Sequence, residues 1–140
     1  MNQKRIVIAV ALIIAVALVA AVAVGYAALP QAQGQIELSA TEFDFGTIPN
    51  TGPVSQVFQV RNAGDGPLAI SGVSTSCGCT TAKVGNQQLA AGESTDLIVT
   101  YDPLAHGGAT GEFMRLVYIR SDDPNTPEAN LTIRVKVVES

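Results

Sequence analysis

The chain has 140 residues, with 8 Lys and Arg against 12 Asp and Glu, so its formal net charge is −4. Two of the basic residues, Lys4 and Arg5, stand at the start; the rest of the chain is therefore more acidic still. An acidic domain without a basic cluster argues against nucleic acid and anionic lipid headgroups as partners. Residues 30–140 have the length of one ordinary domain.

An uncharged, mostly aliphatic run from Ile6 to Leu29 directly follows Lys4 and Arg5. A bilayer-spanning helix needs about 20 such residues, so the run predicts a transmembrane anchor over 6–29. The alternative is a secretory signal peptide, whose apolar stretch is shorter, about 7–15 residues; small residues before Pro30 leave cleavage open. By the positive-inside rule, we expect residues 1–5 in the cytoplasm and the following domain on the extracytoplasmic side of the membrane.

Small residues recur every four positions in this run, at Ala17, Ala21 and Gly25. This spacing lets a second helix approach closely in lipid, so these residues are candidates for helix packing. An alanine-rich segment also produces such spacings by chance, and both interpretations stand.

Residues 30–35 are polar and contain Pro and Gly, which predicts a short linker. The part from 36 to 140 alternates apolar and polar residues in short segments separated by turn-forming residues, and it shows no helical stripe. The expected strands are 36–39, 43–45, 54–61, 68–70 with Val73, 80–84, 97–101, 113–120 and 131–138. Seven or eight strands of this spacing predict an all-β, immunoglobulin-like antiparallel sandwich. The predicted core is Phe43, Phe45, Phe58, Leu68, Ile70, Leu97, Val99, Phe113, Val117, Ile119, Leu131, Ile133 and Val135.

Cys77 and Cys79 are the only cysteines and flank Gly78. Residues two apart in an extended strand are too far apart for easy bridging, but glycine permits a turn that closes the gap. The pair could form a disulfide, pack as free thiols, act in redox exchange or bind a soft metal such as Cu(I). An oxidising compartment favours the bridge.

Other candidate ligands are few. His106, the single histidine, sits in a glycine-containing loop, and Met114 is the remaining soft ligand of the domain; nothing in the sequence brings either close to the cysteines. No acid–base pair or activated nucleophile is recognisable, so we expect neither an enzyme nor a cofactor.

Several segments together resemble a known family. They are Phe-Asp-Phe-Gly at 43–46, Phe-Gln-Val-Arg-Asn-Ala-Gly at 58–64, Leu-Ala-Ile at 68–70, Ser-Cys-Gly-Cys-Thr at 76–80, Ala-Gly-Glu-Ser at 91–94 and Ser-Asp-Asp-Pro at 121–124. This order is similar to the bacterial domain-of-unknown-function 1573 family, in which Ser-Cys-Gly-Cys-Thr is the most specific element. The family resembles the ASH, Hydin and major-sperm-protein class, which implies an immunoglobulin-like sandwich and, by analogy, a scaffolding role.

The sequence therefore predicts a non-enzymatic, membrane-anchored extracytoplasmic domain that binds or scaffolds other proteins. One version is an accessory subunit of a larger membrane complex, with membrane or extracytoplasmic proteins as partners. The alternative is a Cu(I)-binding or thiol-redox module that uses Cys77 and Cys79.

Overall fold

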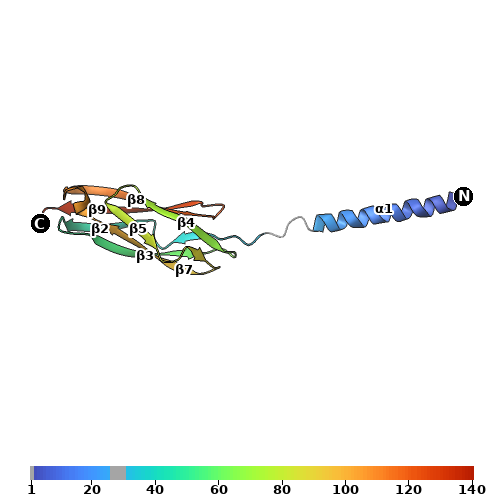
Figure 1. The fold of residues 1–140 in the computed structure, drawn as a ribbon, viewed down its shortest axis with the longest axis horizontal. Helices are drawn as coiled ribbons and strands as arrows, with labels where there is room; N and C mark the ends of the chain where they lie inside the picture. Colours follow the sequence, from blue (N-terminus) through green and yellow to red (C-terminus); the bar gives the residue numbers. More distant parts are fainter. Residues whose placement is uncertain (1, 26–30) are drawn as a thin grey trace. The chain divides into compact units, whose positions relative to one another are not determined.

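The computed structural model describes residues 2–25 and 31–140; for residues 18–25 and His106 it describes the backbone alone. The chain divides into two compact units between Gln31 and Ala32. The first contains one helix and the second contains every strand (Figure 1).

Helix α1 runs over Asn2–Gly25 without interruption. Its aliphatic side chains between Ile6 and Val16 are exposed. Within the described residues, no helix combines the length and hydropathy that a membrane crossing requires. The predicted anchor over 6–29 thus gains no support here, and its residues 26–29 lie outside the described part of the chain.

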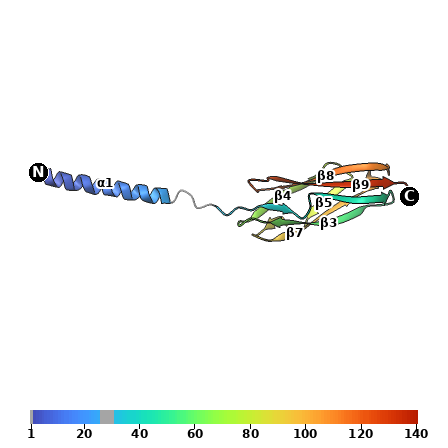
Figure 2. The same ribbon diagram turned by 180° about the vertical axis from the view of Figure 1, so that it is seen from behind.

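The second unit is a sandwich of two sheets (Figures 1 and 2). The four-stranded sheet has the order β1 (Ile36–Leu38), β3 (Val54–Asn62), β7 (Ser94–Tyr101) and β5 (Thr80–Val84). The five-stranded sheet has the order β2 (Glu42–Pro49), β9 (Glu128–Val138), β8 (Gly111–Ser121), β4 (Leu68–Thr75) and β6 (Gln88–Leu89). A short 3₁₀ helix, η1 (Pro103–His106), follows β7.

The sandwich confirms the all-β prediction but corrects it in two respects. There are nine strands among the described residues, because β6 is a two-residue strand that no alternation could indicate. The sandwich is also not wholly antiparallel, since β2 pairs with β9 in parallel, with Phe43 opposite Ile133. The register shifts between Asp44 and Thr47, where Gly46 adopts a φ of 71°. Alternation defines which face of a strand is buried and says nothing of its direction.

The core lies between the sheets and contains ten of the predicted residues as buried side chains. Three predicted phenylalanines, Phe43, Phe45 and Phe113, are only partly buried and pack against its margin. The core also includes residues that were not predicted: Ile36, Ile48, Val60, Cys79, Leu89, Tyr101 and Val137.

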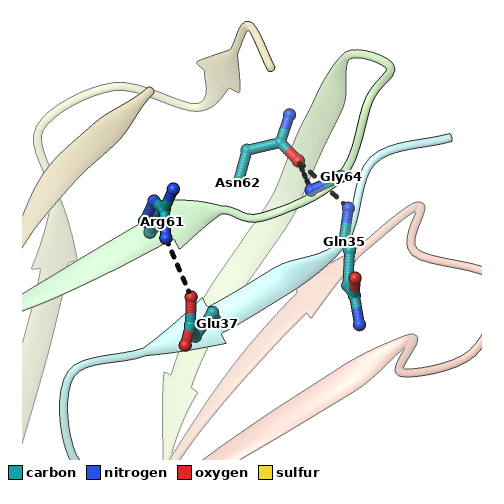
Figure 3. Close-up of polar contacts among 5 residues, drawn as sticks. All are labelled: Gln35, Glu37, Arg61, Asn62 and Gly64. Carbon is teal, nitrogen blue, oxygen red and sulfur yellow. Dashed lines mark hydrogen bonds and ion pairs between the residues drawn. The ribbon is translucent and has the colours of Figure 1, made fainter. Parts of the chain in front are cut away.

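The end of the predicted linker is part of the sandwich, because it is bound to the buried side chain of Asn62 (Figure 3). Asn62 Oδ1 accepts hydrogen bonds from the backbone N–H groups of Gln35 and Gly64, both at 3.0 Å. Its Nδ2 donates to the carbonyl oxygens of Gly66 at 2.8 Å and Leu89 at 3.1 Å. One amide thus joins three chain segments. Gln35, the last residue of the predicted linker, is therefore held by the sandwich.

The side chain of Asp123 forms a second buried polar contact, with the first residue of β1. Only 1% of the surface of Asp123 is exposed. Its Oδ2 accepts from the N–H of Ile36 at 2.9 Å, while Oδ1 accepts from Asn125 at 2.8 Å and Thr126 at 3.1 Å. Burial alone would raise the pKa of this carboxyl, but the three N–H donors outweigh it and hold the pKa below its ordinary 3.8. Asp123 therefore ties β1 to the β8–β9 connection as a carboxylate.

Candidate functional site

The Ser-Cys-Gly-Cys-Thr segment crosses from one sheet to the other. It leaves β4, in the five-stranded sheet, and enters β5, at the edge of the four-stranded sheet. Within it Cys77 and Cys79 are joined by a disulfide, with their Cα atoms 5.3 Å apart. In this state neither sulfur is a thiolate, the form that Cu(I) coordination needs. No group of three or more His, Cys, Asp or Glu side chains suited to a metal ion occurs among the described residues.

The turn is held by hydrogen bonds that do not involve sulfur. The Thr75 hydroxyl lies 2.9 Å from the carbonyl oxygen of Cys77 and 2.8 Å from that of Thr80. The Thr80 N–H donates to the Cys77 carbonyl at 3.3 Å, and the Asp102 N–H donates to the Cys79 carbonyl at 2.8 Å. The segment is therefore fixed to β4 and to the end of β7 independently of the disulfide.

Arg115 of β8 contacts the disulfide directly. Its position on β8 is in phase with the core residue Val117, opposite Ile133 of β9, so its side chain starts from the inner face of the sheet. Its Nε donates to Cys79 Sγ at 3.1 Å. The guanidinium also lies 5.1 Å from the centre of the Phe113 ring, a cation–π contact. Arg115 makes no ion pair with any residue that the structure describes.

Tyr101 of β7 borders the same region and lies opposite Thr80 of β5 in the strand register. Burial of its side chain raises the pKa of the phenol above the ordinary 10.0, while the Arg115 charge opposes this rise and Asp102 adds to it. The phenol is therefore neutral at physiological pH. It therefore adds no negative charge beside Arg115.

The two sulfurs have different environments. Cys79 is buried, with 2% of its surface exposed, whereas Cys77 is only partly buried. Gly78 between them is exposed, and apart from its two chain neighbours no atom lies within 4 Å of the place where a Cβ would stand. The Thr80 hydroxyl lies 3.6 Å from Cys77 Sγ and 3.7 Å from Cys79 Sγ. Cys77 is thus the more exposed cysteine of the pair, and the sulfur of the buried Cys79 borders a cation.

Arg115 is not among the residues predicted from the sequence, although a signal for it exists. Phe113, Val117 and Ile119 mark the inward phase of an alternating strand, and Arg115 occupies that phase. A charged residue in a core phase needs a buried partner, and here the partner is sulfur.

A second feature is an apolar pair on the outer face of the four-stranded sheet. Val57 of β3 and Ile98 of β7 are direct register partners and are 49% and 47% exposed. Lys83 of β5 lies opposite Ile98 on its other side. Val57 and Ile98 are large apolar side chains on a sheet face whose other described side chains are mostly polar.

The other candidates are not brought together. Ala17 lies exposed in α1, and the side chains of Ala21 and Gly25 lie outside the described residues. His106 ends η1, and its side chain is likewise not described. Met114 is exposed on β8, in the opposite phase to Arg115. Met114 therefore points to the opposite face of β8 from Arg115, which contacts the disulfide.

Comparison with solved structures supports the fold. A protein of unknown function from Porphyromonas gingivalis W83 is 27% identical, with a TM-score of 0.68 over 79% of this chain and 50% of that one. The ASH/PapD-like domain of human CEP192 is 10% identical, with a TM-score of 0.57 over 82% and 92%. The E. coli chaperone DraB is 15% identical, with a TM-score of 0.52 over 74% and 56%. The last two likenesses show the fold alone.

The chain spans half the length of the P. gingivalis protein, and no curated protein matches it. The sequence profile described as "Protein of unknown function (DUF1573)" matches residues 36–137, which is nearly the whole sandwich. The match confirms the resemblance carried by the Ser-Cys-Gly-Cys-Thr segment and the turns around it. The chain belongs to the DUF1573 family.

Proposed function

We propose that the sandwich is a non-enzymatic protein-binding domain that uses the outer face of its four-stranded sheet. The observation that carries the proposal is the exposed pair Val57 and Ile98, side by side in the register of β3 and β7. Two large aliphatic side chains on the outside of a sheet lose contact with water when a partner covers them.

The surroundings of the pair resemble the rim of a binding site. Along β3 and β7 the pair is flanked on one side by Ser55 and Thr100, whose hydroxyls are 2.7 Å apart, and on the other by the hydrogen-bonded Gln59 and Asp96. An apolar centre with a polar rim is the usual organisation of a protein interface. The side chains of the rim hold one another in place, so binding orders few additional groups.

The edge of the same sheet offers a second element of recognition. Strand β5 pairs with β7 and with no other strand among those described. An open strand edge can accept an extended segment of a partner through backbone hydrogen bonds. The short length of β5 and the outward Lys83 are features that limit indiscriminate pairing at such an edge.

We also propose that residues 6–29 tether this domain to the bacterial inner membrane, with the sandwich on the extracytoplasmic side. Support comes from the sequence, which is uncharged from Ile6 to Leu29 behind Lys4 and Arg5. The partner would then be a membrane or extracytoplasmic protein, and the chain an accessory subunit of its complex. Alkaline carbonate extraction of membranes tests the tether: the full chain should stay in the pellet, and its release would contradict the tether without touching the binding face.

A photo-crosslinking amino acid placed at position 98 tests the binding face in cells. Crosslinking at Ile98 should produce one discrete adduct, and the same probe at Arg134 should not, because Arg134 is exposed on β9 in the other sheet. Excess purified chain with its native Ile98 should compete the adduct away. Identical adducts from both positions, or none from position 98, would contradict the proposal.

The thiol-redox alternative is favoured by one specific contact, that of Arg115 with Cys79 Sγ. The Cu(I) alternative has no comparable observation in its support.

A further inference from the structure

We propose that the Cys77–Cys79 disulfide is an exchangeable redox bond, opened by an external thiolate that attacks Cys77 while Cys79 leaves as a thiolate beside Arg115. This chemistry is independent of the binding face formed by Val57 and Ile98. It rests on the unequal environments of the two sulfurs.

The direction of attack follows from access. Cys77 is partly exposed, whereas Cys79 is buried among core residues. A thiolate from outside therefore has better access to Cys77 than to Cys79. Access and the identity of the attacked sulfur are two of the factors that set the rate of exchange.

The leaving group is stabilised where it forms. As the S–S bond breaks, negative charge develops on Cys79 Sγ, to which the Arg115 Nε–H already donates at 3.1 Å. A neighbouring arginine lowers the pKa of a thiol, and a thiol of lower pKa leaves faster. Arg115 has no carboxylate partner among the described residues, so its charge is available to the sulfur.

The bond can open without unfolding the turn. It closes a loop with a single intervening residue, and a disulfide stabilises a fold less when the loop it closes is short. The hydrogen bonds of Thr75 to the carbonyl oxygens of Cys77 and Thr80 keep the segment in place in either redox state.

The exchange balances with a dithiol as the reductant. A thiolate of the dithiol bonds to Cys77 Sγ, and the electron pair of the Cys77–Cys79 bond passes to Cys79 Sγ, which becomes a thiolate. The second thiol of the reductant loses its proton, attacks its own partner sulfur in the mixed disulfide and releases Cys77 as a thiolate. The dithiol has then lost two electrons and become a disulfide, and the cysteine pair, after taking up the two protons, is a dithiol.

The test measures the rate at which dithiothreitol reduces the purified full chain under native conditions, with iodoacetamide alkylation and mass spectrometry as the readout. We expect millimolar dithiothreitol to reduce the folded protein, Arg115→Gln to slow reduction about tenfold and Arg115→Lys to restore most of the rate. Arg134→Gln removes an exposed charge from neighbouring β9 and should leave the rate unchanged. An equal rate in the wild type and Arg115→Gln, or a bond that is reduced only in urea, would overturn the proposal.

The single-cysteine variants keep the test decisive if Arg115→Gln does not fold. In Cys79→Ser the remaining Cys77 should form a mixed disulfide with oxidised glutathione at least tenfold faster than Cys79 does in Cys77→Ser. Equal rates, or the reverse order, would overturn the assignment of Cys77 as the attacked sulfur.

Discussion

Replacing Asp123 by Asn tests whether a buried carboxylate fastens β1 to the sandwich. The amide keeps the shape of the side chain but replaces one acceptor oxygen by a donor. If the amide oxygen of the new side chain faces Asn125 and Thr126, the amide NH₂ faces the Ile36 N–H, and that donor loses its acceptor. If the amide is flipped, the N–H groups of Asn125 and Thr126 lose their acceptor instead. Asn125 and Thr126 are exposed and can bind water, but Ile36 is 8% exposed and cannot readily do so.

An unsatisfied buried donor costs about 1–3 kcal/mol, so we expect Asp123→Asn to lower the free energy of unfolding by about 2 kcal/mol at pH 7. Urea unfolding of the full chain can be followed by circular dichroism. Tryptophan fluorescence cannot be used, because the protein has three Tyr and no Trp. The matched control is Asp65→Asn, which alters an exposed carboxyl and should change the free energy by less than about 0.5 kcal/mol.

The pH dependence of the stability difference between wild type and Asp123→Asn is the test that can refute this role of Asp123. The pKa of Asp123 is lower in the folded protein than its ordinary 3.8, so the stability it contributes is present above that value and is lost as the pH falls through the folded pKa. The gap between wild type and Asp123→Asn should be constant from neutral pH down to about pH 5 and should narrow below about pH 4. A gap below about 0.5 kcal/mol at pH 7, or one that widens on acidification, would refute the reasoning.

Three further predictions concern the packing of the domain. Asn62→Ala removes an amide that satisfies backbone groups of three segments and should cost about 3 kcal/mol by urea unfolding; a cost below 1 kcal/mol would contradict its role. Gly34→Ala places a Cβ 2.5 Å from the Pro67 carbonyl oxygen and should cost about 2 kcal/mol, whereas Gly52→Ala meets no atom within 4 Å and should be near neutral; equal effects would count against the docking of this segment. Ultraviolet titration should find the Tyr101 phenol ionising above pH 10.0, and Arg115→Gln should raise its pKa further; a fall would be inconsistent with the placement of that charge.

The strand faces and turns of the sandwich were predictable because they depend on residues that are close in sequence. Alternation in 54–61 and 131–138 indicates which side chains point inward, and the buried residues of β3 and β9 follow it. The turn-forming residues between the expected strands likewise indicated where strands end. These features depend on sequence separations of a few residues.

The features that were missed depend on contacts between distant residues. The parallel pairing of β2 with β9 joins segments about 90 residues apart, and alternation is the same in either direction. The sequence pattern assigns no partner to the Asn62 side chain, and only the fold shows that this side chain accepts a hydrogen bond from the backbone N–H of Gln35. The contact between Arg115 and Cys79 links positions 36 residues apart, so the inward phase of Arg115 was visible but its partner was not.

The most direct measurement of the proposed binding face is quantitative copurification with Ile98→Glu in the full chain. A carboxylate beside Val57 would be desolvated without a partner at the interface, so recovery of the crosslinked protein should fall at least tenfold while the urea midpoint stays unchanged. Lys136→Glu, on β9 in the other sheet, should leave recovery intact. Undiminished recovery with Ile98→Glu, in a protein that is folded, would contradict a partner on the outer face of the four-stranded sheet.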